Sequence, residues 1–263
     1  MINMKNIMYK KTVEDEKRII EIEKTLTIPY PIKTKYNIII PTNIFQTWHS
    51  KILPPLMTQS IIKIKKLNPK FNYFLYDDND CREFIRLNFR KDVLDAYDRL
   101  IPGAYKADLW RYCVLFIKGG IYLDIKYTPL NGFKFINLTE SEHFVYDIDR
   151  TNIYNALMVC LPGNKLLISA INTIVENVRN KFYGSSFLEP TGPKLLSKLI
   201  TTDDHKVVID LKHNELNGDN NYRIIYFNDK PILKSYNGHT TERDKNSKKK
   251  HYSHLWNERR VYL

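Results

Sequence analysis

Residues 103–132, GAYKADLWRYCVLFIKGGIYLDIKYTPLNG, organise the rest of the chain. From Ala104 to Lys118 apolar side chains cover most of a helical surface and no Gly or Pro interrupts them, which predicts a largely buried helix. Gly119 is placed to adopt the left-handed conformation that commonly ends a helix. Asp108 and Arg111 lie three residues apart on one face of this helix. They need a partner or a ligand, because an isolated buried charge is costly.

The segment that follows, IYLDIKY (residues 121–127), alternates as a strand before Thr128 and Pro129 end it. In this register Tyr122, Asp124 and Lys126 share one face. A carboxylate and an ammonium at the end of an apolar strand make a candidate functional site. The alternative is a half-buried edge strand with an exposed ion pair, which would contribute little.

Four motifs stand in a fixed order, with a TGP segment at residues 191–193 after them: IPTNIFQTW (40–48), NPKFNYFLYDDNDCREFI (68–85), KADLWRY (106–112) and GGIYLD (119–124). This ordered set resembles the DXD-type glycosyltransferases of family 32. That family includes fungal α-1,6-mannosyltransferases, capsular-polysaccharide sugar transferases and, more distantly, clostridial glucosylating toxins. The resemblance implies a GT-A type α/β fold, Rossmann-like, with a mostly parallel sheet flanked by helices. It also implies a nucleotide-diphosphate sugar donor, a glycan acceptor and retention of anomeric configuration.

The resemblance further implies which residues bind the donor. Asp108 and Arg111 match the pair that holds hydroxyl groups of the donor, and Asp124 and Lys126 are the candidate catalytic residues. The donor-binding set is Gln46, Thr47, Trp48, Asp108, Arg111, Tyr122, Asp124, Thr191 and Gly192. A place in the core is the alternative for Trp48. No pair of carboxylates identifies itself as nucleophile and acid.

One departure from the family pattern concerns the metal. The D-x-D motif stands here as Asp124-Ile125-Lys126. Because Asp124 is present and a literal D-x-D follows at Asp147 and Asp149, we expect a rearranged Mn²⁺ or Mg²⁺ site with weakened metal affinity, whose ligands are Asp124, Asp147, Asp149 and the tail residue His254. The alternative is that Lys126 itself approaches the diphosphate and replaces part of the role of a metal.

Length and pattern predict one domain with two appendages. The 263 residues divide into an N-terminal helical extension (1–36, with a helix near 13–26) and a main domain (37–263). The resemblance implies that this main domain is of GT-A type and that its basic tail, from about residue 239, covers the donor site. Within the domain we expect strands at 44–48, 71–76 and 143–150 and helices at 54–67 and 83–88, the last capped by Asp80. Strands that alternate with helices favour a parallel sheet with ligands at its carboxyl edge.

Composition limits the partners. Lys and Arg number 41 against 29 Asp and Glu, a net charge of +12 that suits a nucleotide-sugar diphosphate or an acidic polysaccharide as well as nucleic acid. No nucleic-acid-binding motif is present, so no specific nucleic acid is expected. No apolar stretch is long enough for a membrane-spanning segment, and the odd count of three cysteines argues against a disulfide framework. A soluble, cytoplasmic protein of a large DNA virus or an AT-rich microbe is the expectation.

Three functions remain open. The first is a retaining hexosyltransferase. The second is a relic of the family that binds sugar nucleotides or glycans without turnover, which the loss of the second DXD carboxylate favours. The third is a basic nucleic-acid-binding protein.

Overall fold

The computed structural model describes residues 24, 27, 29–148, 150–200, 207–215, 223–246 and 250–263. Their helices are α2 (Pro55–Leu67), α3 (Asp78–Asn88), α4 (Lys91–Arg99), α5 (Gly103–Lys118), η1 (Phe135–Leu138), α6 (Lys165–Arg179), α7 (Pro193–Leu199), α8 (His239–Asn246) and α9 (Tyr252–Asn257). Their strands are β1 (Asn43–Thr47), β2 (Asn72–Tyr76), β3 (Gly120–Leu123), β4 (Tyr127–Pro129), β5 (Glu142–Tyr146), β6 (Ile153–Cys160), β7 (Val207–Glu215), β8 (Arg223–Phe227) and β9 (Lys230–Ser235).

The nine strands of the described residues form one sheet in the order β2-β1-β3-β6-β5-β7-β8-β9-β4. Strands β2, β1 and β3 run parallel, as do β5 and β7, whereas β6, β8, β9 and β4 join their neighbours antiparallel. The expected α/β class is therefore present, and the parallel part is the Rossmann-like half that the motifs of residues 40–124 build. The antiparallel strands extend the sheet beyond it.

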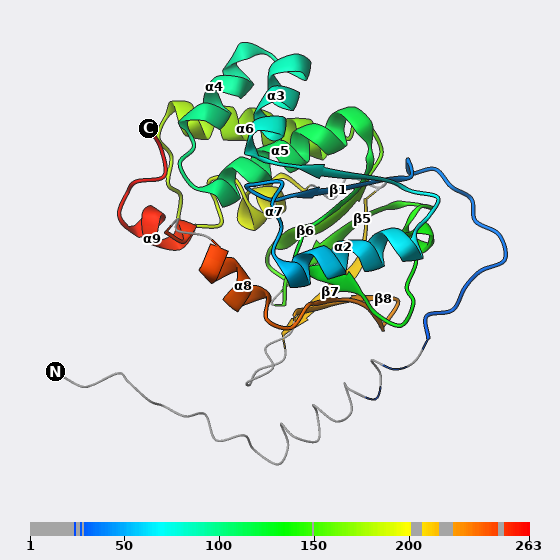
Figure 1. Ribbon diagram of the computed structural model, residues 1–263. Coiled ribbons are helices and arrows are strands. Elements are labelled where there is room, and N and C mark those ends of the chain that lie inside the picture. Colours follow the sequence, from blue (N-terminus) through cyan, green and yellow to red (C-terminus); the bar gives the residue numbers. More distant parts are fainter. Residues whose placement is uncertain are drawn as a thin grey trace.

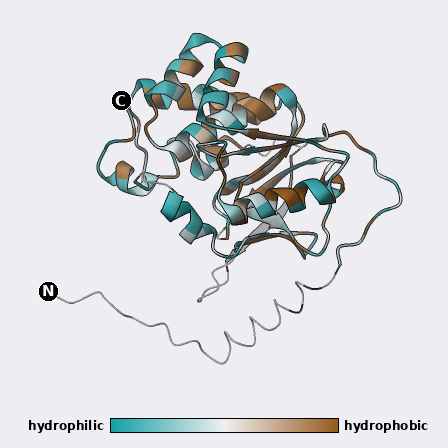
Figure 2. Ribbon diagram, in the orientation of Figure 1, coloured by the Kyte–Doolittle hydropathy of each residue, from teal (hydrophilic) through white to brown (hydrophobic). Residues whose placement is uncertain are grey.

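Helices cover both faces of the sheet (Figure 1). On one face α3 to α7 pack on Phe45 and Tyr122, and on the other α2 and η1 pack on Ile44 and Ile121. Adjacent residues of β1 and β3 thus enter opposite cores, which is the alternation predicted for residues 121–123. Figure 2 shows the result, a hydrophobic centre of strands and inward helix faces with hydrophilic outer surfaces.

The junction of α5 and β3 confirms the helix–glycine–strand prediction. Gly119 ends α5 with φ of +58°, and a Cβ there would lie 2.6 Å from Pro162 Cδ. Gly120 has φ of +116°, and its Cβ would lie 2.7 Å from the Asn43 carbonyl oxygen. The two glycines therefore let the chain reverse against β1 at a distance that no other residue permits.

The strand prediction for residues 121–127 is correct only as far as Leu123. The Tyr127 N–H donates to the Asp124 carbonyl (3.0 Å), which makes residues 124–127 a turn between β3 and β4. The Ile125 side chain packs beside Met57 and Tyr236 instead of extending the ladder. The turn brings the side chains of Asp124 and Lys126 to the same edge of the sheet.

Two further expectations change in detail. Helix α3 begins at Asp78 rather than at residue 83, because Asp77 is its N-cap and forms a capping box with Asp80. Asp80 therefore completes the cap that it was expected to provide alone. The helix expected near 13–26 lies outside the described residues, apart from a helical Lys24. Within the described part of the chain, no helix is long and apolar enough to span a membrane.

Candidate functional site

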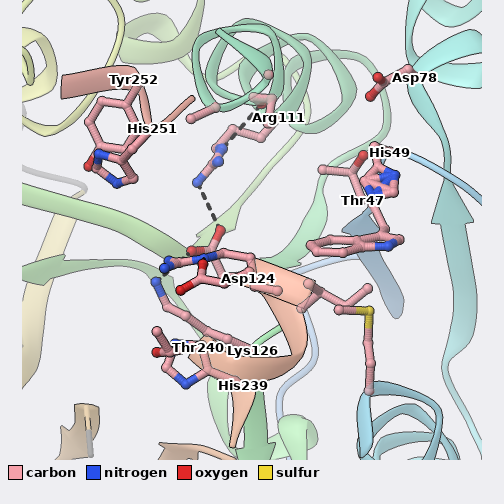
Figure 3. Close-up of a pocket in the computed structure, with 18 of the residues that line it drawn as sticks. Thr47, His49, Asp78, Arg111, Asp124, Lys126, His239, Thr240, His251 and Tyr252 are labelled. Atoms are coloured by element: carbon pink, nitrogen blue, oxygen red, sulfur yellow. Dashed lines mark hydrogen bonds and ion pairs between the residues drawn. The ribbon is translucent and has the colours of Figure 1, made fainter. Parts of the chain in front are cut away.

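A cavity of about 650 Å³ opens where β1 and β3 end (Figure 3). Thr47, Trp48 and His49 line one wall as the chain leaves β1, and Ala107 and Arg111 line another from α5. The floor is the turn after β3. The carboxyl edge of the parallel strands is where open α/β sheets bind their ligands, as the sequence predicted.

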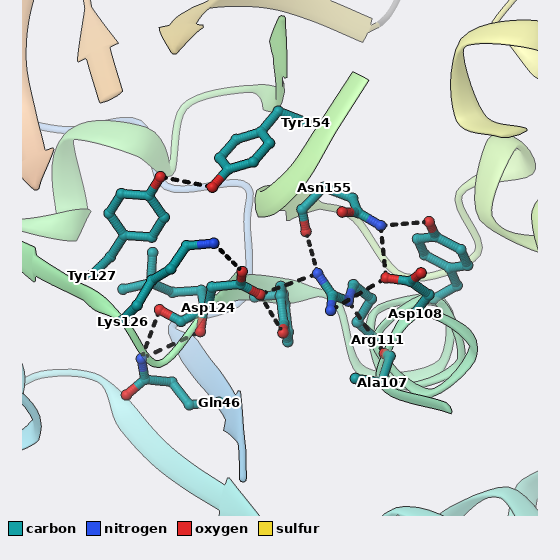
Figure 4. A network of polar contacts seen from close by, with 12 residues as sticks. Gln46, Ala107, Asp108, Arg111, Asp124, Lys126, Tyr127, Tyr154 and Asn155 are labelled. Carbon is teal, nitrogen blue, oxygen red and sulfur yellow. Dashed lines mark hydrogen bonds and ion pairs between the residues drawn. The ribbon is translucent and has the colours of Figure 1, made fainter. Parts of the chain in front are cut away.

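Asp124 lies at the centre of this cavity with both carboxylate oxygens occupied (Figure 4). Oδ1 accepts from Arg111 Nη1 (3.2 Å) and from the Tyr122 hydroxyl (2.8 Å), and Oδ2 contacts Lys126 Nζ at 3.0 Å. Burial raises the pKa of this carboxyl, but Lys126, Arg111 and the Tyr122 hydroxyl together lower it below its ordinary value. Asp124 is thus ionised between two cations.

Every nitrogen of the Arg111 guanidinium has a polar partner. Besides Asp124 it donates to the Asn155 carbonyl through Nη1 (2.7 Å) and to the Ala107 carbonyl through Nε (3.2 Å), while Nη2 lies 3.3 Å from Asp108 Oδ1. The Tyr122 ring packs under it, 4.3 Å from Cζ to the ring centroid. A guanidinium held in this way positions Asp124 rigidly and places a fixed positive charge at the cavity wall.

Asp108 supports the site from behind the cavity wall. Its Oδ1 accepts from Asn155 Nδ2 (2.9 Å) and its Oδ2 from the Thr191 hydroxyl (2.8 Å). Burial raises the pKa of Asp108 above its ordinary value, although Arg111 and these hydrogen bonds oppose the shift. Asp108 therefore holds Arg111 and the loop at Thr191 in place, and it does not line the cavity itself.

Lys126 faces the cavity opposite Arg111. Its ammonium contacts Asp124 and lies over the Tyr127 and Tyr154 rings, 5.5 and 5.4 Å from their centroids. Burial lowers the pKa of Lys126, but Tyr154 and Asp124 outweigh burial and raise it. The side chain is 21% exposed, so a charged ammonium is presented to the cavity from a restrained position.

The C-terminal tail closes the cavity from the other side. Helix α8 is attached by Glu242, whose carboxylate accepts from the Leu56 and Met57 N–H groups (2.7 and 3.2 Å) at the start of α2. From the tail His239, Arg243, Lys250, His251 and Tyr252 line the cavity together with Arg223 of β8. The tail is therefore part of the site's wall in this structure.

The cavity is electropositive. Its described lining includes five Lys or Arg side chains (Arg111, Lys126, Arg223, Arg243, Lys250) against three Asp (Asp78, Asp124, Asp244). Burial and the nearby Lys126, Arg243 and Arg223 lower the pKa of His239 to about 4, so this imidazole is neutral at pH 7. The same field attracts anions.

The structure sorts the expected donor-binding residues into two groups. Thr47, Trp48, Arg111, Tyr122 and Asp124 line the cavity, together with Lys126, which was expected as a catalytic residue. Gln46, Asp108, Thr191 and Gly192 lie behind the wall. Gln46 is fully buried and donates to the Leu123 and Asp124 carbonyls (3.2 and 3.4 Å), which fixes the turn that carries the acid. A Cβ on Gly192 would lie 3.2 Å from Asp108 Oδ2.

The expected metal ligands do not come together. Asp147 follows β5 and His254 lies in α9, and neither lines the cavity around Asp124. Asp149 lies outside the described residues. Among the residues that the structure describes, no group of three His, Cys, Asp or Glu side chains is placed to hold a metal ion.

Sequence reasoning missed Asn155, Tyr154 and Arg223, and it expected a basic tail at the donor site without naming Arg243 or Lys250. Asn155 is buried, donates to Asp108 and to the Tyr112 hydroxyl (2.8 Å), and so connects β6 to α5. Its signal was a polar residue at the start of an apolar run. For Arg223 of β8 no local signal exists, because only the folding of the later strands brings it to the site.

Comparison with known proteins agrees with this geometry. Residues 54–144, which include Asp108, Arg111, Asp124 and Lys126, match the family described as glycosyltransferase sugar-binding region containing DXD motif. The match covers about a third of the chain. The glycosyltransferase resemblance of the sequence is therefore confirmed for the region that carries the candidate site.

Individual relatives are similar over parts of the chain. Inositol phosphoceramide mannosyltransferase 3 of Schizosaccharomyces pombe is 32% identical over 162 residues, which are 60% of this chain and 44% of the relative. An uncharacterised glycosyltransferase of Acanthamoeba polyphaga mimivirus is 35% identical over 88 residues, 33% of this chain and 35% of the relative. The chain thus spans less than half the length of these curated relatives. Among solved structures, the PaToxG glycosyltransferase superposes with a TM-score of 0.45 at 16% identity, covering 71% of this chain and 76% of that one.

Proposed function

We propose that this protein is a retaining glycosyltransferase that moves a hexose from a nucleotide-diphosphate sugar to a hydroxyl group of a glycan or glycoconjugate. The observation that carries the proposal is the fixed Arg111–Asp124–Lys126 arrangement, which faces an electropositive cavity. These three residues lie in the region that matches the glycosyltransferase family model. Mannosyltransferases among the relatives support a sugar transfer reaction.

The cavity offers each part of such a donor a complementary group. The excess of cations suits the diphosphate, whose charge grows as the sugar departs. Trp48 and the neighbouring His49 ring, 4.6 Å apart between centroids, form an aromatic surface for the nucleotide base. The Asp124 carboxylate accepts hydrogen bonds from ribose or sugar hydroxyl groups. Arg111, which was expected to hold such hydroxyl groups itself, acts by positioning Asp124.

The chemical step needs positioning and charge stabilisation above all. The bond between the sugar's anomeric carbon and the β-phosphate oxygen weakens through a transition state of oxocarbenium character, so negative charge accumulates on the diphosphate. The cavity cations stabilise that charge, and the neutral His239 near them adds a hydrogen-bonding group.

The Mn²⁺ or Mg²⁺ that a DXD region implies fits this donor set poorly. Hard divalent cations take several oxygen ligands. Here both oxygens of Asp124 already contact cations, and Asp244, another carboxylate of the cavity, pairs with Arg243 at 2.9 Å. No step of the proposed reaction therefore depends on a metal.

A thermal-shift panel tests the proposal. UDP-, GDP- and dTDP-sugars are added to the full chain, each with EDTA and with MnCl₂. A true donor at one hundred times its Kd stabilises the folded state by about 2.7 kcal/mol. For a chain of this size that raises Tm by roughly 5–10 °C. If no sugar nucleotide shifts Tm under either condition, the proposal fails.

Two variants that each remove one positive charge test where the donor binds, and one product assay identifies the stereochemistry of the reaction. Arg243→Gln removes a cation of the cavity and should weaken donor binding, whereas Lys70→Gln removes an exposed cation from the turn before β2 and should leave it unchanged. NMR of the product's anomeric proton then reports retention or inversion directly.

A further inference from the structure

The position of the second DXD acid is occupied by a cation that the fold holds in place. The turn at residues 124–127 fixes the backbone of Lys126, because its carbonyl accepts from the Tyr236 N–H (2.9 Å) while the Tyr127 N–H closes the turn. The ammonium is held between Asp124, at 3.0 Å, and the Tyr127 and Tyr154 rings. This side chain is partly buried and directed into the cavity rather than out to solvent (Figure 3).

The surroundings of Lys126 are those of an anion site. Arg223 and Arg243 line the cavity with it, and both lie close enough to influence the neutral His239. These cations arrive from β8 and α8, elements that do not belong to the DXD region. A divalent cation beside Asp124 would face Arg111 and Lys126 at close range, whereas a phosphate group would be attracted by the positive charges of the cavity lining.

We infer that Lys126, together with Arg223 and Arg243, binds the diphosphate of the donor in the place of a divalent cation, so that this site works without metal. The inference rests on the proposed function and specifies how its leaving group is stabilised. Asp124 then has two roles. It restrains the ammonium, and it offers its carboxylate to hydroxyl groups of the donor.

The reaction balances without an added reactant. The bond between the anomeric carbon and the β-phosphate oxygen breaks, and its electron pair stays on the diphosphate, where Lys126 neutralises part of the charge. A bond forms between the anomeric carbon and the acceptor's oxygen. The proton of the acceptor hydroxyl passes to the departing diphosphate. The products are the glycoside and a nucleoside diphosphate.

Binding of UDP and GDP to the EDTA-treated full chain, measured by calorimetry, is the first test. Equal Kd values in EDTA and in MnCl₂ are expected for the nucleotide that binds. Binding that needs MnCl₂ would overturn the inference and leave the proposed function standing. No binding of either nucleotide or of any donor sugar under both conditions would overturn the two together.

Substitutions at residue 126 are the second test. Lys126→Gln should weaken nucleoside diphosphate binding in EDTA about 10- to 100-fold, because hydrogen bonds between charged groups are worth that much. Lys126→Arg keeps the charge and should retain most of the affinity. Thermal melts of each variant show that the fold is intact.

Lys126→Asp restores the D-x-D pattern and gives the sharpest contrast. It should abolish binding in EDTA and make binding depend on MnCl₂, and Mn²⁺ alone should now be retained by the protein in electron paramagnetic resonance titrations. The matched control is Lys70→Asp, with the same charge change at an exposed turn, which should behave as wild type. Retention of Mn²⁺ by the wild-type chain as strong as that of Lys126→Asp, or equal nucleotide affinity of Lys126→Gln and wild type, would refute the inference.

Discussion

Asp124→Asn should destabilise the fold strongly, whereas Asp108→Asn in the same network should not. Asp124 lies 3.2 Å from Arg111 and 3.0 Å from Lys126, with 23% of its side chain exposed. At about 3 Å and an effective dielectric near 20, each pair is worth about 5 kcal/mol before desolvation. An asparagine amide would also turn its NH₂ group toward one of the two cations. Removing one partner of a buried pair typically costs 3–5 kcal/mol, and partial exposure places this case near 3 kcal/mol.

Asp108 differs in the balance of its environment. Its raised pKa shows that burial outweighs the favourable charges around it. The Thr191 hydroxyl that donates to Oδ2 can rotate and accept from an amide instead. We therefore expect Asp108→Asn to cost about 1 kcal/mol or less, within the range of one neutral hydrogen bond.

Urea denaturation at pH 7 measures both variants, and pH separates the causes. The pKa of Asp124 is lowered in the folded state, so its stabilisation is complete above the unfolded value of about 4 and is lost as pH falls through the folded value. The difference between wild type and Asp124→Asn should therefore shrink below pH 4. Equal losses for the two variants at pH 7, or a difference that does not change with pH, would refute the reasoning.

Two further predictions follow from the backbone and the tail. Glu242→Gln should weaken the attachment of α8 to the start of α2 by about 1 kcal/mol. Hydrogen exchange or proteolysis in residues 239–246 should then become faster, while exchange in the sheet stays unchanged. Unchanged protection of α8 would show that other contacts hold it. Gly120→Ala should destabilise the protein by several kcal/mol in thermal unfolding, because its Cβ would meet the Asn43 carbonyl at 2.7 Å with φ of +116°. Gly103→Ala, with no atom within 4 Å of its Cβ, should be neutral or stabilising. Similar effects of the two changes would contradict this account.

Local pattern sufficed for the elements that carry the family motifs. The apolar surface of α5 and the glycines after it are short-range signals, and they fixed where the chain turns toward the site. The turn at residues 124–127 was missed because the alternation of IYLDIKY is equally good as a strand. It becomes a turn because Ile125 finds its place beside Met57 and Tyr236, which are 68 and 111 residues away in sequence.

The prediction of the metal ligands was limited in the same way, because it depended on which residues the fold brings together. Asp147 and Asp149 have the spacing of a ligand pair, and spacing was the criterion that the sequence offered. Whether two carboxylates share a site with Asp124 depends on where β5 ends relative to β3. Strand β6 lies between those two strands, and Asp147 is not among the residues that line the cavity.

The departure at Lys126 and the cations of β8 and the tail belong to one electrostatic arrangement. An ammonium in place of the second acid leaves the diphosphate with a single point charge where a metal would bind two oxygens. Arg223 and Arg243 add positive charge to the cavity lining, from elements about 100 residues further along the chain. His239, which lies near both arginines, is neutral and adds no further positive charge, and Asp244 pairs with Arg243. An acid at residue 126 with a bound cation would instead put a divalent charge beside these arginines, so the residue at 126 and the cationic tail favour the same metal-free mode of binding.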